Sequence, residues 1–331
     1  MKMILSAHKW SAIFAILSST VGAFPSAIAY AGDAPRFSFA VVADPRGHGD
    51  TWKNALTEIR DMTVNPEPKF SPSEFIIVVG DMDPADDRHS DYTEVFSRCV
   101  RKPLFLPVIG NHDDDEEELS YISDTIVPAI PGVVRRHPSS CDYFLDYKNV
   151  RVIVVDAYHE LGHKGVINRT GKEWAENVIV RAPPQIEHIF LFFHEPAFPR
   201  FRHLTSSFNE SPKERNSFWN MLVRHRDRVC AVFVSHDHHY YRIKVKSAAG
   251  AAANDTSLFP DEEGGVCQVG CGAAGMDWVN TVIRVQVDGK NVIFRVVQAK
   301  NGMNKPFAVK DEWQVIPCPA FTPTHGIQVV R

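Results

Sequence analysis

The segment FIIVVGD (Phe75–Asp81) decides how this chain of 331 residues is interpreted. Five apolar residues in succession are typical of a buried strand, and the Gly-Asp pair that follows them marks a turn at the strand's end. The same form recurs at four other places along the chain. Apolar runs at residues 37–42, 104–109, 189–193 and 229–234 precede four polar motifs: Asp44, Gly110-Asn111-His112-Asp113, His194 and His236-Asp237-His238.

These polar motifs are expected to converge in space. The carboxyl ends of parallel strands meet at one edge of a sheet, so residues that are far apart in the chain can share one pocket. Carboxylates, an amide oxygen and imidazoles together suit hard-to-borderline divalent metals. The pattern therefore predicts a metal-dependent hydrolase.

Residues 1–31 have the form of a Sec-type signal peptide. Lys2 and Lys9 lie at its start, residues 10–24 carry no charge, and Ala29-Tyr30-Ala31 has small residues at the spacing of a cleavage site. The alternative is a membrane anchor, but a spanning helix needs about 20 apolar residues, more than this segment offers. We expect cleavage near Ala31, a secreted or periplasmic protein, and no membrane span in the mature chain.

The charge balance argues against a nucleic-acid polymer as partner. The chain has 36 basic and 40 acidic residues, a formal net charge of −4. Lys2 and Lys9 are the only charged residues of the signal segment, so the exported chain is more acidic still. Domains that bind polymeric nucleic acid are normally basic. A small-molecule or protein-borne phosphate ester is easier to reconcile with this balance, and the oligomeric state stays open.

Six cysteines in an exported chain permit disulfides, whose pairing the sequence leaves open. Cys267 and Cys271 are four residues apart, and along a strand this spacing is about 13 Å, beyond the ~7 Å that a bridge tolerates. Gly270 would have to make a turn between them. Cys230 lies within an apolar run and is interpreted as a buried residue.

Residues 36–110 alternate strand and helix patterns, which predicts a layered α/β domain. Helices are expected at residues 51–62 and 91–98. From residue 141 the pattern changes. Residues 143–147 and 150–156, joined by Lys148-Asn149, predict an antiparallel hairpin that begins a second sheet.

Two further helices are expected at residues 172–181 and 217–226. Additional strands are expected at residues 241–245, 266–269, 278–287 and 291–298. No internal repeat or long linker interrupts the pattern. We therefore expect a signal peptide at 1–31, one catalytic domain at 35–300 and a C-terminal surface extension at 301–331.

The order and spacing of the polar motifs resemble the calcineurin-like metallophosphoesterase superfamily, whose pattern is D-x-H, G-D, G-N-H-D/E, a lone His before a Pro-containing loop, and G-H-x-H. The corresponding segments are Asp44-Pro45-Arg46, Gly80-Asp81, Gly110-Asn111-His112-Asp113, His194-Glu195-Pro196 and Ser235-His236-Asp237-His238. The resemblance covers roughly residues 37–298. It implies an α/β fold, a four-layer α/β/β/α sandwich of two stacked mixed sheets flanked by helices.

The resemblance also implies a site for two divalent metal ions, with Asp81 as the carboxylate that bridges them. Two cations ~3.5–4 Å apart can share a hydroxide and neutralise phosphoryl oxygens during in-line displacement. Mn, Fe, Zn and Co all suit mixed oxygen and imidazole ligands, so the metal's identity stays open. The implied remaining ligands are Asp44 and His238 for one ion, and Asn111, His194 and His236 for the other.

His112 is not implied as a ligand. In this superfamily the corresponding His donates a proton to the leaving-group oxygen, and a carboxylate, here Asp113, orients it. Imidazole suits this role because its pKa lies close to the working pH.

The first motif departs from the superfamily's pattern, because Arg46 replaces its His. A guanidinium stays protonated and cannot ligate a cation, so the first metal site loses a ligand. Water could fill the gap, His48 could supply a replacement, or the site could be weak. We interpret Arg46 as a phosphate-contacting residue, since its fork matches a phosphoryl group. The alternative is that Arg46 pairs with Asp44 or Asp83 and shapes the loop.

Two charged segments remain ambiguous. Residues 113–118 could trap cations, although the acids at 115–118 are also typical of a helix's first turn. Residues 200–228 contain seven Lys or Arg against three acids; they could recognise an anionic substrate or form an ordinary charged helix and loop.

The sequence thus favours an exported phosphoesterase in which a metal-bound hydroxide attacks phosphorus and His112 protonates the departing alkoxide. A phosphomonoesterase is the first choice. A phosphodiesterase or nucleotide pyrophosphatase on the same site is the second. A non-catalytic metal- or phosphate-binding relative, disabled by Arg46, and a metal-sequestering protein are the rival classes.

Overall fold

A computed structural model describes residues 34–158, 165–247, 264–275, 279–300 and 306–315. Contacts along the chain group residues 34–331 into one unit, to which every described residue belongs. The expected signal peptide and cleavage site lie outside the described residues.

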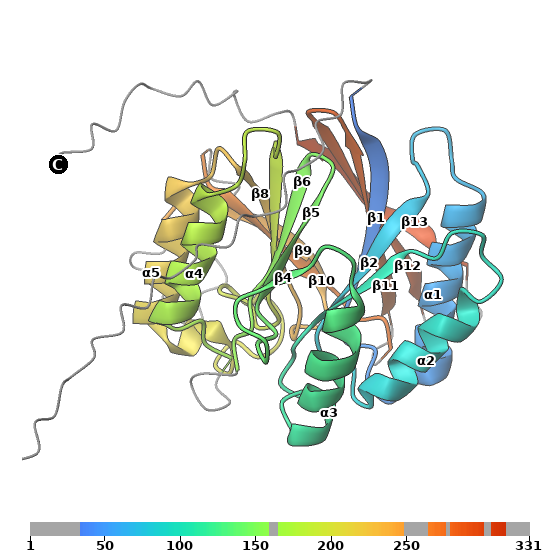
Figure 1. Cartoon of the computed structure of the whole chain (residues 1–331), viewed down its shortest axis with the longest axis horizontal. Helices are drawn as coiled ribbons and strands as arrows, with labels where there is room; N and C mark the ends of the chain where they lie inside the picture. The colour runs from blue at the N-terminus through green and yellow to red at the C-terminus, as the bar shows by residue number, and fades with distance from the viewer. Residues whose placement is uncertain (1–33, 159–164, 248–263, 276–278, 301–305, 316–331) are drawn as a thin grey trace, which may run out of the picture. The chain divides into compact units, whose positions relative to one another are not determined.

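Two mixed sheets form the centre of the fold (Figure 1). In the first, β1, β2 and β3 run parallel, and β11, β12 and β13 continue from β1 in antiparallel register. Its strand order is β13 (Ala308–Val315), β12 (Asn291–Lys300), β11 (Val279–Asp288), β1 (Arg36–Val42), β2 (Ser73–Val79) and β3 (Leu104–Val108).

In the second sheet, β6, β7, β8 and β10 run parallel to one another. The pairs β4–β5, β5–β6 and β10–β9 are antiparallel. The predicted hairpin is its β5–β6 pair. The strand order is β4 (Val134–Arg135), β5 (Tyr143–Tyr147), β6 (Val150–Val154), β7 (His188–Phe192), β8 (Val229–Val234), β10 (Val266–Cys271) and β9 (Tyr240–Val245).

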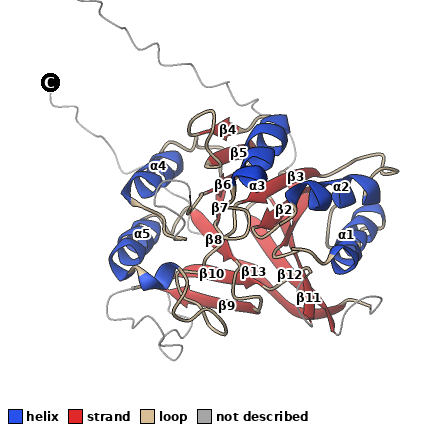
Figure 2. Ribbon diagram, turned by 90° about the horizontal axis from the view of Figure 1, so that it is seen from below, coloured by secondary structure: helices blue, strands red, loops and turns tan. Residues whose placement is uncertain are grey.

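Helices cover the outer faces of both sheets. Figure 1 shows α1 and α2 beside the first sheet and α4 and α5 beside the second, and Figure 2 shows the same layers from below. The four-layer α/β/β/α prediction is therefore confirmed. The helices are α1 (Gly49–Val64), α2 (Ala85–Val95), α3 (Glu116–Tyr121), α4 (Arg169–Val180) and α5 (Pro212–Arg224), with short helical turns at Ile122–Ile126, Val127–Ala129 and Phe208–Glu210.

Helix α1 illustrates how the pattern specifies an outer layer. Trp52, Leu56 and Ile59 recur at spacings of four and three, and all three are fully buried. Such spacing places side chains on one helix face, which here packs against the sheet. Among the described residues, no helix has both the length and the apolarity that crossing a membrane requires.

The core lies between the two sheets and is rich in aromatic rings. Phe190 on β7 contacts Phe39 on β1 and Phe294 on β12, with ring centroids 5.3 and 6.3 Å apart. Both contacts cross from the second sheet to the first. This packing fixes the distance between the sheets, and so the distance between the loops that leave them.

Several elements differ from the sequence prediction, among them helix α5, which begins at Pro212, five residues before the expected start. Helix α2 begins at Ala85, six residues before the expected start. The sequence pattern missed this first part because the buried face of the helix includes a charged residue, Arg88, beside Ala85 and Tyr92. Residues 308–315, expected in a surface extension, form β13 at the edge of the first sheet. Its side chains are mostly exposed and polar, so the sequence lacks an apolar alternation there.

The acidic run is explained by helix capping. The Asp115 carboxylate accepts hydrogen bonds from the backbone N–H groups of Glu117 and Glu118, both at 3.0 Å, and three acids fill the first turn of α3. This is the arrangement that the helix dipole favours. Within the described part of the chain, no disulfide joins any of its cysteines, which are Cys99, Cys141, Cys230, Cys267 and Cys271.

Phe190→Ala is expected to destabilise the fold strongly, because it opens a cavity where the sheets meet. Large-to-small changes at buried Phe cost about 3–5 kcal/mol. Phe201→Ala, at a side chain that is 55% exposed, should cost less than about 1 kcal/mol. Urea unfolding of both variants measures the difference, and equal losses would show that Phe190 does not hold the sheets together.

Candidate metal centre

The first two motif loops are fastened to each other where β1 and β2 end. The backbone N–H of Asp44 donates to the carbonyl of Gly80 at 3.1 Å, and that of Arg46 donates to the carbonyl of Asp81 at 2.9 Å. These bonds continue the parallel pairing of the strands into their loops. They bring the carboxylates of Asp44 and Asp81 together at the edge of the sheet.

Backbone strain is concentrated in these loops. Asp44, Asp81, His236 and His238 have φ values of 48°, 55°, 63° and 54°, and Arg46 has 31°. Residues other than glycine seldom adopt this left-handed region, and such strain gathers where function requires a particular side-chain direction. Four of the six predicted ligands are held in this way.

Two glycines allow the close approach of the loops. A Cβ on Gly80 would overlap the imidazole of His194, and a Cβ on Gly110 would overlap the carboxylate and backbone nitrogen of Asp81. The Gly-Asp and Gly-Asn motifs therefore need glycine for space. This explains the glycine of each motif independently of any ligand role.

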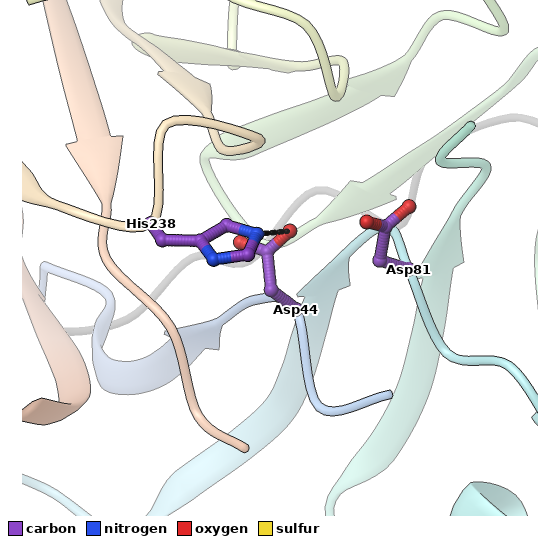
Figure 3. Close-up of side chains that lie close together, drawn as sticks. All are labelled: Asp44, Asp81 and His238. Atoms are coloured by element: carbon purple, nitrogen blue, oxygen red, sulfur yellow. Dashed lines mark ion pairs between the residues drawn. The ribbon is translucent and has the colours of Figure 1, made fainter. Parts of the chain in front are cut away.

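Among the described residues, one carboxylate oxygen of the fully buried Asp44 has no hydrogen-bond partner. Its Oδ2 accepts a short hydrogen bond from the Ser235 hydroxyl, whereas its Oδ1 has none. The unpartnered Oδ1 lies 3.6 Å from Nε2 of His238 (Figure 3). One potential ligand atom from each of Asp44, Asp81 and His238 lies within 4.8 Å of the others.

The electrostatics of this group favour a cation. Burial, and then the charge of Asp81, raise the pKa of Asp44 well above its ordinary value. Two neighbouring carboxylates in a buried site repel each other unless a positive charge lies with them. A divalent metal ion supplies that charge and a partner for the unpaired oxygen, so these residues fit such an ion.

His194 is oriented as a ligand. Its Nδ1 lies 2.9 Å from the carbonyl oxygen of Val79, which can only accept, so Nδ1 carries the proton of the neutral ring. Its Nε2 then presents a lone pair to Asn111 Oδ1 at 3.2 Å and Asp81 Oδ1 at 3.3 Å. Three lone-pair-bearing atoms directed at one another fit a shared cation, and the Val79 carbonyl is the second partner that ligating imidazoles usually have.

His236 has a comparable arrangement. Its Nε2 donates to the carbonyl of Ser206 at 3.0 Å, and its ring centroid lies 5.2 Å from that of His194. Burial and the neighbouring imidazoles of His194 and His203 lower the pKa of His236 to about 2. His236 is therefore neutral and has Nδ1 available as a donor atom.

The third motif loop adjoins the cluster through its backbone. The N–H of His112 donates to Asp81 Oδ1 at 3.1 Å, and the side chain of His112 is partly exposed. Asp113 is fully buried; its two oxygens accept from Met82 N at 2.6 Å and Gly110 N at 2.8 Å. Asp113 thus ties the second loop to the third, and its expected role of orienting His112 stays a prediction.

Arg46 pairs with an acid, which is the alternative that the sequence left open. Its Nε lies 3.1 Å from Asp83 Oδ1, and its carbonyl accepts from Arg88 Nη1 at 2.7 Å. His48 immediately precedes α1 and its side chain is exposed. Within the described residues, the group of close ligand atoms does not include His48.

Sequence reasoning missed the residues that hold the ligands in place. Ser235, which donates a hydrogen bond to Asp44, occupies the position where the superfamily's pattern has glycine. This departure is the feature of the sequence that could have identified Ser235. Asp237, between two predicted ligands, is fully buried and accepts backbone N–H groups of residues 200–202. Arg202 lies against His238. Such contacts depend on tertiary packing and leave no motif.

Gly110→Ala is expected to abolish high-affinity cation binding, because the added methyl group would displace the Asp81 carboxylate. Gly47→Ala is the matched control in a neighbouring loop, since a Cβ there would meet no atom within 4 Å. Titration calorimetry with Mn²⁺ compares the two variants. Equal affinity in both would contradict the assigned role of Asp81.

Cation binding should also change how stability depends on pH. The native state holds the Asp44 proton more tightly than the unfolded chain does, so the metal-free protein loses stability as the pH rises through the raised pKa of Asp44. Mn²⁺ should therefore raise the thermal midpoint more at about pH 8 than at about pH 5. At about 100 times its dissociation constant, Mn²⁺ should add about 2.7 kcal/mol to the free energy of unfolding.

Asp44→Asn is the test of that prediction. The metal-free variant should be more stable than the unmodified protein at about pH 8, and Mn²⁺ should raise its midpoint less. An undiminished Mn²⁺ shift in this variant, measured by scanning calorimetry, would exclude Asp44 as a ligand.

Comparison with known proteins bears on both the fold and the site. The structure of PhoD is similar with a TM-score of 0.52 at 8% sequence identity, over 86% of this chain and 73% of PhoD. Vps29 of Entamoeba histolytica, as a single mutant, gives a TM-score of 0.37 at 7% identity, over 84% of this chain and 99% of that one. Vps29 of Chaetomium thermophilum gives 0.37 at 10% identity, over 87% and 100%.

At 8% identity, the likeness to PhoD concerns the fold alone, and the two Vps29 likenesses are too weak to support an argument. No curated protein matches the chain. The calcineurin-like phosphoesterase family matches residues 37–240, more than half of the chain, and this stretch contains all five polar motifs. The chain therefore belongs to the calcineurin-like phosphoesterase family.

Proposed function

We propose that this protein is an exported, metal-dependent phosphoesterase whose first substrate class is a small-molecule or protein-borne phosphate monoester. The observation that carries the proposal is the fully buried Asp44 carboxylate, whose Oδ1 has no hydrogen-bond partner and faces His238 beside Asp81. A buried acidic group in this condition is stable when a cation completes it. Family membership supports phosphoester hydrolysis as the reaction class.

The ligand roles proposed from the sequence are retained. Asp81 would be the carboxylate shared by two cations, and the lone pairs on His194 and His236 support a set of donors beyond the Asp44 group. When bound, divalent cations lower the pKa of a water molecule and neutralise phosphoryl oxygens. Asp44 and His238 would hold one ion, and Asn111, His194 and His236 would hold the other.

His112 is proposed as the general acid. Its backbone is held to Asp81, and its side chain is partly exposed beside the cluster, where a leaving group can reach it. In the hydrolysis, water adds to phosphorus and releases a proton to the solvent, and the ester P–O bond breaks. The bonding electron pair goes to the leaving oxygen, which takes a proton from His112, and His112 regains a proton from the solvent. A phosphodiesterase or nucleotide pyrophosphatase would use the same residues on a different ester.

His112→Ala is expected to lower the hydrolysis of nitrophenyl phosphate in the presence of Mn²⁺ or Zn²⁺ by about 10²–10⁴-fold, the usual contribution of a general acid. Metal affinity should not change. His225→Ala is the control, because His225 pairs with Glu176 at 3.1 Å, between α4 and α5.

The same assay with bis-nitrophenyl phosphate separates the ester classes. Faster turnover of the diester would favour the phosphodiesterase. A protein that binds metal and turns over neither ester with any of these cations would contradict the proposal and favour a binding protein.

Export is a separate part of the proposal and rests on the pattern of residues 1–31. Amino-terminal sequencing of protein recovered from the periplasm or the medium should give a start near Gly32. Retention of Met1 would contradict export by cleavage.

A further inference from the structure

The loop from Arg200 to Ser207, here called the 200–207 loop, lies against the imidazoles of the cluster. The His203 ring centroid is 3.9 Å from that of His236 and 6.4 Å from that of His238. The carbonyl of Ser206, in the same loop, accepts from His236. The loop is therefore part of the wall of the candidate metal centre.

A buried carboxylate fixes the backbone of this loop. Asp237, which lies between two predicted ligands in sequence, accepts the backbone N–H of Arg200 at 2.7 Å and that of Phe201 at 3.2 Å. It also accepts a short hydrogen bond from the N–H of Arg202. Bonds from backbone N–H groups to a buried charge are among the strong hydrogen bonds of proteins. Asp237 thus holds the backbone of Arg202 beside the ligands.

The side chain of Arg202 contacts a ligand directly, with Nη1 2.8 Å from Nδ1 of His238. A guanidinium has only donors, so Nδ1 of His238 accepts, and the proton of the neutral ring lies on Nε2. Nε2 is the atom that faces Asp44. A protonated ring nitrogen has no lone pair for a cation.

Ligation by His238 through Nε2 would place the ring's proton on Nδ1, directed at the N–H groups of Arg202. The observed contact and that ligation therefore exclude each other. A cation held by His238 through Nε2 would therefore require the guanidinium of Arg202 to leave the ring. The backbone of Arg202 is held separately, by Asp237.

We propose that Arg202 binds the phosphoryl oxygens of the substrate. Its guanidinium contacts His238 only when no cation is bound. The inference rests on the proposed function. A guanidinium fork matches two oxygens of a phosphoryl group. Arg202 contacts a predicted ligand, His238, from a loop that lines the cluster. The ligand class is a phosphate monoester, or free phosphate as its simplest analogue.

The test uses titration calorimetry on the full chain, with Mn²⁺ and then with inorganic phosphate added to the Mn²⁺-loaded protein. Arg202→Gln should weaken phosphate binding about tenfold or more, the effect of losing a hydrogen bond to a charged group. The same variant should bind Mn²⁺ as tightly as the unmodified protein or more tightly, because the competitor for His238 is gone. Arg226→Gln, at an exposed arginine near the end of α5, should change neither value.

Arg202→Lys gives a second comparison, because it keeps the positive charge but removes the paired N–H donors of the guanidinium. Its phosphate affinity should lie between those of Arg202→Gln and the unmodified protein. It also replaces Arg202→Gln if that variant does not fold.

Three results would overturn the inference: unchanged phosphate affinity in Arg202→Gln, an absence of phosphate binding in the unmodified protein, or a parallel loss of Mn²⁺ and phosphate affinity. Phosphate binding is measured without turnover, which separates the two proposals. An inactive protein whose phosphate binding depends on Arg202 would contradict the proposed function alone. An active protein whose phosphate affinity survives Arg202→Gln would contradict this inference alone.

Discussion

The juxtaposition of Asp44 and Asp81 is the constraint on which the rest of the site depends. Both carboxylates are almost completely removed from water, at the ends of adjacent parallel strands, where the loops are tied backbone to backbone. Burying two acids together is unfavourable because desolvation and mutual repulsion both oppose ionisation. The fold holds them there with left-handed backbone and with glycines at positions where a side chain would collide.

The buried acids of the site differ in how their oxygens are used. Asp113 and Asp237 accept several backbone N–H groups and serve as anchors between loops. Asp44 has one anchored oxygen and one without a partner. The anchors maintain the geometry, and the open oxygen of Asp44, with the open nitrogens of His194 and His236, is where a ligand can bind. Structural and ligating acids can therefore be told apart by their hydrogen bonds, although the sequence presents them alike.

Much of the fold could be predicted because its strands are buried apolar runs with a strong pattern. Phe75–Val79 and the other motif strands follow this rule, and each motif loop begins where its strand ends. Helix α2 was misplaced and β13 was missed for the same reason: a buried Arg88 and an exposed, charged edge strand carry no hydrophobic period. Within the site, the convergence of Asp44, Asp81 and His238 followed from topology. The anchoring role of Asp237 and the contact of Arg202 with His238 did not, because they depend on a loop that folds back from elsewhere in the chain.

The central claim is that a cation occupies the space between Asp44, Asp81 and His238. Crystals grown with Mn²⁺ and measured for anomalous scattering at the manganese edge test it most directly. The account predicts an anomalous peak within coordination distance of Asp44 Oδ1 and of an Asp81 oxygen, with His238 as a further ligand. A map without a peak at this position, at a Mn²⁺ concentration that saturates the protein in solution, would contradict it.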